Sequence, residues 1–229
     1  MPSFLQQIKY MFHQAMLSEF ANKERIISPL LFALTVILLF NFALGDVDPS
    51  YRTQMFIAQI FLTALLALQV GFSRLFDQEQ EDRVFDLQRT YPVNYFAWFI
   101  SKFLHIMTIG GLILYPALII GMFLNSNSLV KNLPGFIVLT STCALLGLAG
   151  LGVTLAAVTI KANAKQILFP LLYFPLTVPI LLAAVQSSVI FVETGKIEST
   201  SHWLAMLGLF DVIYFTLGLL LYGELVDDS

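Results

Sequence analysis

The feature that most limits the fold of this chain is a series of six long apolar stretches. A helix that crosses the hydrocarbon core of a bilayer needs about 20 mostly apolar residues. The third to fifth stretches exceed that length, which predicts tilt, kinks or protruding ends. The six predicted membrane spans are residues 29–45, 53–73, 96–124, 134–160, 166–192 and 203–223.

The composition agrees with a lipid-facing surface. Hydrophobic residues make up 58% of the 229 residues and charged residues only 12%, whereas soluble domains carry about 25% charged residues. So few charges cannot cover a surface that faces water on all sides. We therefore predict an all-α integral membrane protein with six transmembrane helices, forming a single transmembrane domain over 1–229. The net charge of −3 argues against nucleic-acid binding.

Motifs that would give the chain a chemistry of its own are absent from the sequence. The single cysteine, Cys143, lies in an apolar run, so neither a CxxC metal site nor a CxxCH haem attachment exists. HExxH, GxSxG and the GxxxxGK[ST] phosphate loop are also missing. We expect no catalytic residues, no metal site and no directly bound cofactor, and any ATP that drives the protein must bind another chain.

Basic residues alternate between the two sides of the predicted membrane. Nine of the 12 lie in or beside the N-terminal segment and the connections after the second and fourth spans. The positive-inside rule then places both termini in the cytoplasm. The nine are Lys9, Lys23, Arg25, Arg74, Arg83, Arg89, Lys102, Lys161 and Lys165, and the other side has Arg52, Lys131 and Lys196.

The cytoplasmic segment 1–28 has the pattern of an amphipathic helix, which we expect over residues 3–24. Apolar residues recur at helical spacing on one face, while mostly polar residues occupy the other. The helix either lies flat on the membrane surface or packs against the bundle. The apolar face holds Phe4, Ile8, Met11, Phe12, Ala15 and Met16, and the other face holds Gln7, Lys9, His13, Gln14 and Ser18.

The cytoplasmic loop 74–94 is the longest polar stretch, and it mixes charged residues with apolar ones. Phe76, Phe85 and Leu87 stand among eight charged residues. A solvated loop is one interpretation, but such a loop has little need for these apolar side chains. A short helix with an apolar face and a charged rim is suited to docking onto a soluble partner. Pro92 then ends this element before the third span.

This loop resembles that of the haem exporter B family, the membrane subunit of the bacterial cytochrome c maturation system and an ABC-2 type permease. The family pattern has a phenylalanine, an acidic run, a short amphipathic stretch, a proline, and a lysine ten residues later. The matching positions are Phe76, 77–82, Phe85 with Asp86, Pro92 and Lys102. The chain departs from the pattern at Arg83, where a glycine is usual, and at Gln88, where a leucine is usual.

The resemblance extends over nearly the whole chain. The stretch SPLLFALTVILLFNFALG at 28–45 is similar to the family's first span, and GLAGLGVTLAAVT at 147–159 also matches. The fifth span, KQILFPLLYFPLTVPILLAAV, has the family's repeated prolines at Pro170, Pro175 and Pro179. The sequence Phe210-Asp211-Val212 and the acidic C-terminus match as well.

The resemblance implies a half-transporter in the bacterial inner membrane. It would pair with a second membrane subunit (the same chain or a haem-handling protein), a cytoplasmic ABC ATPase that binds ATP, and a periplasmic haem chaperone, with haem as the substrate. The N-terminal helix would be an elbow helix, and the loop a coupling element that contacts the ATPase. The residues implied in that coupling are Phe76, Glu79, Arg83, Phe85, Leu87, Arg89 and Pro92.

Other function classes remain open at this point. An ABC-2 permease for a lipid, glycan or drug would share the same topology. A passive scaffold would recruit the ATPase without coupling its hydrolysis to haem. An intramembrane enzyme would need paired carboxylates or histidines at one depth, and only Asp211 lies in the middle of a span.

Polar residues within the spans are candidates for function. A mid-bilayer Asp costs about 2.5–3.5 kcal/mol on insertion scales and normally faces the bundle interior. Asp211 therefore lies either in the translocation path or at a subunit interface, or it is a protonated structural residue; Lys102 is the other intramembrane polar candidate. His202 and His105 are candidates to lie near haem, because histidine is a common axial ligand. His202 could equally anchor the span at the interface beside Trp203.

Two further patterns concern helix shape and packing. Pro170, Pro175 and Pro179 each remove a backbone hydrogen bond from the fifth span, which fits either a flexing gate helix or a static kink. The small residues of the fourth span should let another helix approach closely. These small residues are Gly147, Ala149, Gly150 and Gly152.

Overall fold

A computed structural model describes residues 3–44, 48–73, 75, 94–124, 134–159 and 165–227, and the regular structure in these ranges is helical. Six of the helices are long and apolar enough to cross a membrane. The predicted all-α class with six spans is therefore confirmed, and the chain is a multi-pass membrane protein. The helices are α1 (Phe4–Ala21), α2 (Glu24–Leu44), α3 (Pro49–Ser73), α6 (Tyr95–Leu124), α8 (Pro134–Thr159), α9 (Lys165–Thr194), the short η1 (Glu198–Thr200) and α10 (Ser201–Asp227).

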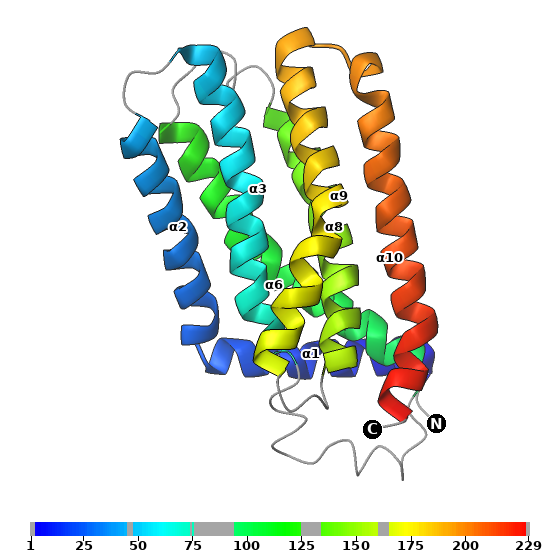
Figure 1. Cartoon of the computed structure of the whole chain (residues 1–229). Helices are drawn as coiled ribbons and strands as arrows, with labels where there is room; N and C mark the ends of the chain where they lie inside the picture. The colour runs from blue at the N-terminus through cyan, green and yellow to red at the C-terminus, as the bar shows by residue number, and fades with distance from the viewer. Residues whose placement is uncertain are drawn as a thin grey trace.

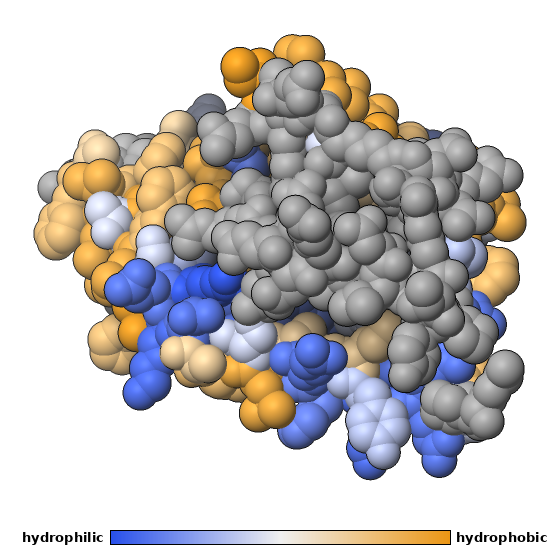
Figure 2. Space-filling view, turned by 90° about the horizontal axis from the view of Figure 1, so that it is seen from below, coloured by the Kyte–Doolittle hydropathy of each residue, from blue (hydrophilic) through white to orange (hydrophobic). Residues whose placement is uncertain are grey.

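The six long helices lie side by side and alternate in direction (Figure 1). Helix α1 lies across one end of the bundle, and both chain termini lie at that same end. We call this end the α1 end and the opposite one the far end. Helices α2, α6 and α9 begin at the α1 end, and α3, α8 and α10 finish there. Hydrophilic residues gather at the α1 end beside hydrophobic ones (Figure 2).

The longest spans are α6 and α9, with 30 residues each. At 1.5 Å per residue each is about 45 Å long, which exceeds the roughly 30 Å of a hydrocarbon core. Helix α6 accordingly runs obliquely behind the other helices (Figure 1). The excess length predicted for these spans is thus present, and tilt absorbs part of it.

The first two spans begin earlier than their apolar runs predict. Helix α1 ends at Ala21 because Asn22 leaves helical geometry, with φ −106° and ψ 71°, and α2 then starts at Glu24 rather than at Pro29. Pro29 lies inside α2, where it removes only one backbone bond near the start. Helix α3 begins at Pro49, and a proline is favoured at the first position of a helix because its φ is already helical.

Helix α8 forms the centre of the bundle. In its membrane window 72% of the residues are buried, against 17% for α2 and for α10. Its glycines allow this central position. The backbone nitrogen of Phe215 comes within 3.4 Å of the place where a Cβ on Gly150 would lie, and the Phe72 ring fills the corresponding place at Gly152. The close helix packing predicted for this stretch is therefore observed.

Helix α1 begins with a capping box, in which the Ser3 side chain and the Gln6 side chain each bond the other's backbone N–H. The predicted apolar face is half-buried from Ile8 to Met16, whereas Phe4 is exposed, and Met11 and Met16 pack against the two core clusters. The opposite face is mostly exposed, for example at Tyr10 and Leu17, while Gln7 and Ser18 are half-buried. Packing of α1 against the bundle is therefore observed, and contact of α1 with a membrane surface stays a prediction.

Candidate functional site

A buried polar contact at the α1 end joins α6 to the chain just after α3. Lys102 is only 6% exposed, and its ammonium group donates a hydrogen bond to the backbone carbonyl of Leu75 at 3.0 Å. Leu75 comes two residues after the end of α3. A cation is favourable close to the C-terminal end of a helix, where the helix dipole is negative. Lys102 thus fixes the point where the chain leaves α3.

A second polar contact lies one turn further along α6. His105 is buried, and its Nε2 atom lies 3.6 Å from the Oε1 atom of Glu19 in α1. Among the described residues, neither ring nitrogen of His105 has a hydrogen-bond partner. The same Glu19 oxygen lies 4.0 Å from the guanidinium group of Arg25 in the first turn of α2. One carboxylate therefore faces groups from two helices.

No role was predicted for Glu19 from the sequence, although its position on the apolar face of α1 indicated one. The predicted apolar face of α1 runs through Ile8, Met11, Phe12 and Ala15, and Glu19 continues that face four residues after Ala15. A carboxylate at an apolar position indicates a polar partner on the surface that the face contacts. His105 on α6 is that partner.

The residues implied in ATPase coupling lie outside the described part of the chain. Their role stays a prediction, and the nearest described positions are Leu75 and Asn94. Asn94 is joined to α1, because its backbone N–H donates to the side-chain oxygen of Gln7 at 3.2 Å. The residues outside the described ranges are Phe76, Glu79, Arg83, Phe85, Leu87, Arg89 and Pro92.

Asp211 lies near the middle of α10 and points toward α8. Its Oδ1 atom occupies the place where a Cβ on Gly147 would lie. This oxygen is buried and has no hydrogen-bond partner among the described residues. The nearby Tyr214 hydroxyl instead donates to the backbone carbonyl of Leu176 at 2.8 Å. The hydroxyl of Tyr214 is therefore bonded to the backbone of α9 and not to the Oδ1 atom of Asp211.

The three prolines of the predicted gate helix all lie within α9, which stays helical from Lys165 to Thr194. Pro175 is exposed, while Pro170 and Pro179 are half-buried. The half of α9 toward the α1 end packs through aromatic rings, with Phe169 and Tyr173 centred 5.8 and 5.4 Å from the Phe72 ring of α3. Whether α9 flexes at these prolines stays a prediction.

The half of α9 toward the far end is tied to its neighbours by directional contacts, which we call the far-end clasp. The side-chain amide of Gln54 in α3 donates to Glu193 at 2.7 Å. The hydroxyls of Thr140 in α8 and Ser188 lie 2.8 Å apart. The Phe136 and Phe191 rings of the same two helices stack with centroids 3.7 Å apart.

The two candidate haem-proximal histidines lie at opposite ends of the bundle. His105 is buried near the α1 end, whereas His202 is exposed in the first turn of α10 at the far end. The His202 ring lies edge-on to that of Trp203, with centroids 5.9 Å apart. The structure does not bring the two histidines together. In the described ranges no three metal-ligating side chains gather either.

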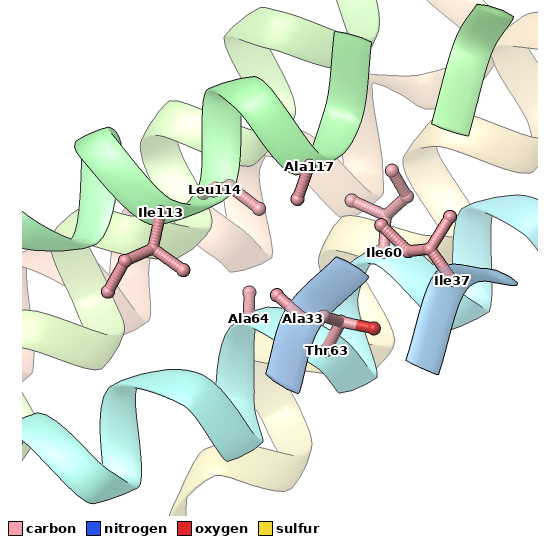
Figure 3. Close-up of a pocket in the computed structure, with 8 residues that line it drawn as sticks. All are labelled: Ala33, Ile37, Ile60, Thr63, Ala64, Ile113, Leu114 and Ala117. Carbon is pink, nitrogen blue, oxygen red and sulfur yellow. The ribbon is translucent and has the colours of Figure 1, made fainter. Parts of the chain in front are cut away.

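A small cavity lies where α2, α3 and α6 meet (Figure 3). The free space inside it is about 10 Å³, which is about the room that one water molecule needs, and Thr63 is the one polar residue among its lining residues. Sites for drug-sized ligands usually have about 300–1,000 Å³. The cavity is therefore too small for a large planar substrate.

A comparison with protein families gives a match over nearly the whole chain. The family described as "CcmB protein" matches residues 6–223, a range that begins within α1 and includes all six spans. No curated protein matches the chain.

Proposed function

The chain belongs to the CcmB family, the haem exporter B family that its sequence resembles, and on this premise we propose that it is the permease subunit of an ATP-driven complex for haem export or release in cytochrome c maturation. The observation that carries the proposal is the family match across all six spans. It favours this function over ABC-2 permeases for other substrates.

The sequence supports dependence on a separate ATPase. It holds no phosphate-binding loop, so ATP has to act through a contact with another chain. The cytoplasmic loop 74–94 supplies that contact. Lys102 holds Leu75, near the start of this loop, by a hydrogen bond to its backbone carbonyl. Nucleotide binding then moves the loop relative to the bundle, and the helices alternate between two arrangements.

The orientation of the complex follows from the charges at the α1 end. Nine of the 12 basic residues belong to the segments on that side, and by the positive-inside rule this supports a cytoplasmic α1 end with both termini on the same side. The far end then faces the periplasm, where the haem chaperone acts. His202 is exposed at that end and offers an imidazole to haem iron.

Two parts of the bundle support a mechanical role. Three prolines interrupt the backbone ladder of α9, and neighbouring helices stabilise such breaks in lipid. The Oδ1 atom of Asp211, which has no hydrogen-bond partner among the described residues, lies within the same three-helix group of α8, α9 and α10. A polar group without a partner in one arrangement is suited to gain one in another, which biases the equilibrium between them.

Co-purification tests the proposal. The tagged chain is isolated in mild detergent, and the ATPase subunit bound to it is identified and quantified by mass spectrometry. Reversing the charges of Arg83 and Arg89 to Glu should reduce the ATPase recovered, because these residues belong to the proposed contact. The matched control reverses Lys9 and Lys23, which are exposed at the same end.

Haem transfer to the periplasmic chaperone is then measured for the intact complex with ATP and with a non-hydrolysable analogue. Faster transfer with hydrolysis supports the permease. If the ATPase is recovered but haem transfer is equally fast with ATP and with the analogue, the chain is a scaffold instead. Absence of the ATPase from the wild-type preparation contradicts the proposal.

A further inference from the structure

Two polar side chains on the same face of α6 contact other parts of the chain near the α1 end. Lys102 and His105 are three residues apart and therefore neighbours on that face. Both are buried, with 6% and 5% of their surfaces exposed. Their partners belong to different parts of the chain, since Lys102 holds the carbonyl of Leu75 and His105 faces Glu19. This turn of α6 thus stands between the exit of α3 and helix α1.

Packing alone does not account for these groups. A buried ionisable side chain is costly, and apolar residues of similar volume often hold helices together equally well. Directional contacts, in contrast, fix one arrangement and change when either partner moves. The contacts of Lys102 and His105 therefore define where Leu75 and Glu19 lie relative to α6.

Helix α1 depends on such a contact more than the spans do. None of its residues is fully buried, and elements with little buried apolar surface open and shift at low cost in free energy. The Glu19 carboxylate also faces Arg25 at the start of α2. A displacement of α6 that changes the contact with His105 would therefore move α1 relative to α2.

We propose that the turn of α6 from Lys102 to His105 transmits displacement of the α3 exit to helix α1. The proposal rests on the proposed function, because nucleotide binding by the ATPase supplies the displacement. Lys102 and Glu19 act as positioning residues at the two sides of this turn. Helix α1 then changes position with each ATPase cycle.

Hydrogen exchange measured by mass spectrometry on the intact complex tests the proposal. Exchange is compared with and without a non-hydrolysable ATP analogue, in peptides covering the α3 exit (70–75) and α1 (4–21). In the wild type the nucleotide should change exchange in both. Glu19→Gln keeps the size of the side chain, so the response at the α3 exit should remain while the response of α1 is lost. Lys102→Met should also abolish the response of α1.

Two neighbouring substitutions serve as controls, namely Glu24→Gln and Lys23→Met, because both residues are exposed at the same end. Each should leave both responses intact, and loss of the α1 response in either would overturn the proposal. An undiminished α1 response in Glu19→Gln would overturn it too. A wild-type response at the α3 exit without one in α1 overturns this proposal alone, whereas no response in either peptide overturns the proposed function as well.

Discussion

The Oδ1 atom of Asp211 on α10 fills the space beside Gly147 on α8 that any larger residue would need. The two residues therefore depend on each other, because the carboxylate reaches the interior of the bundle only where α8 has no side chain. Ile180 of α9 borders the same space. A glycine and an acid that look unrelated in the sequence thus form one contact among three helices.

Gly147→Ala should destabilise the folded chain. The new methyl group would overlap Asp211 and Ile180, and overpacking of this kind costs about 1–3 kcal/mol. Unfolding in detergent measures the change in free energy. Gly208→Ala is the control, because its added Cβ would meet no other part of the described bundle within 4 Å, and stability there should be unchanged or slightly higher, since alanine favours a helix over glycine. Equal stability of Gly147→Ala and the wild type would contradict the close contact.

Asp211→Asn should reduce haem delivery severalfold while the amount of folded chain stays near that of the wild type. The amide has the same shape as the carboxyl group, so the fit against Gly147 is kept, whereas the ability to carry a negative charge is lost. Yields of c-type cytochrome, normalised to the permease in the membrane, measure the effect. Glu198→Gln at the exposed far end serves as control. Normal yields for Asp211→Asn would make the residue structural.

Pro175→Ala should leave stability unchanged or raise it, and should slow haem delivery. The Pro175 side chain is exposed, so little packing is lost, and the alanine restores a backbone N–H inside α9. An interior proline costs a helix about 3 kcal/mol in water. Thermal unfolding and haem transfer by the same preparation separate the two effects. Pro116→Ala in α6 is the matched control, and wild-type transfer by Pro175→Ala would identify a static kink.

Thiol labelling should place the two ends of the bundle on opposite sides of the membrane. Asn22→Cys and Lys196→Cys are introduced into a Cys143→Ala background, since Cys143 is the single native cysteine. Both positions are exposed. A membrane-impermeant maleimide should react with position 196 in intact cells and with position 22 only after permeabilisation. The opposite pattern would reverse the proposed orientation.

The spans were predictable to within a few residues because lipid imposes one simple requirement. A backbone in hydrocarbon must satisfy its own hydrogen bonds, so each apolar run long enough to cross becomes a helix. The third span ends at Leu124 as predicted. The first span differs because its helix already includes the polar residues Glu24 and Arg25. At this depth the chain meets water and lipid headgroups, so hydropathy no longer marks where the helix begins.

The contacts between helices were less predictable. Periodicity identifies the packed face of α1, but it does not say that this face lies on α6 or that Glu19 lies beside His105. The position of Asp211 opposite Gly147 depends on how far α10 is shifted along α8. Such offsets are set by side-chain packing between elements distant in the sequence, and no local pattern encodes them.

The far-end clasp would make α9 a lever in any state in which the helix bends at Pro179. The ties through Glu193 and Ser188 hold the helix beyond Pro179, while the 15 residues from Lys165 to Pro179 form an arm of about 21 Å from end to end. A swing of only about 10° at Pro179 would carry the tip of that arm by roughly 4 Å. A small angular change at Pro179 would thereby be amplified at the α1 end of the helix, while the ties to α3 and α8 hold its far end.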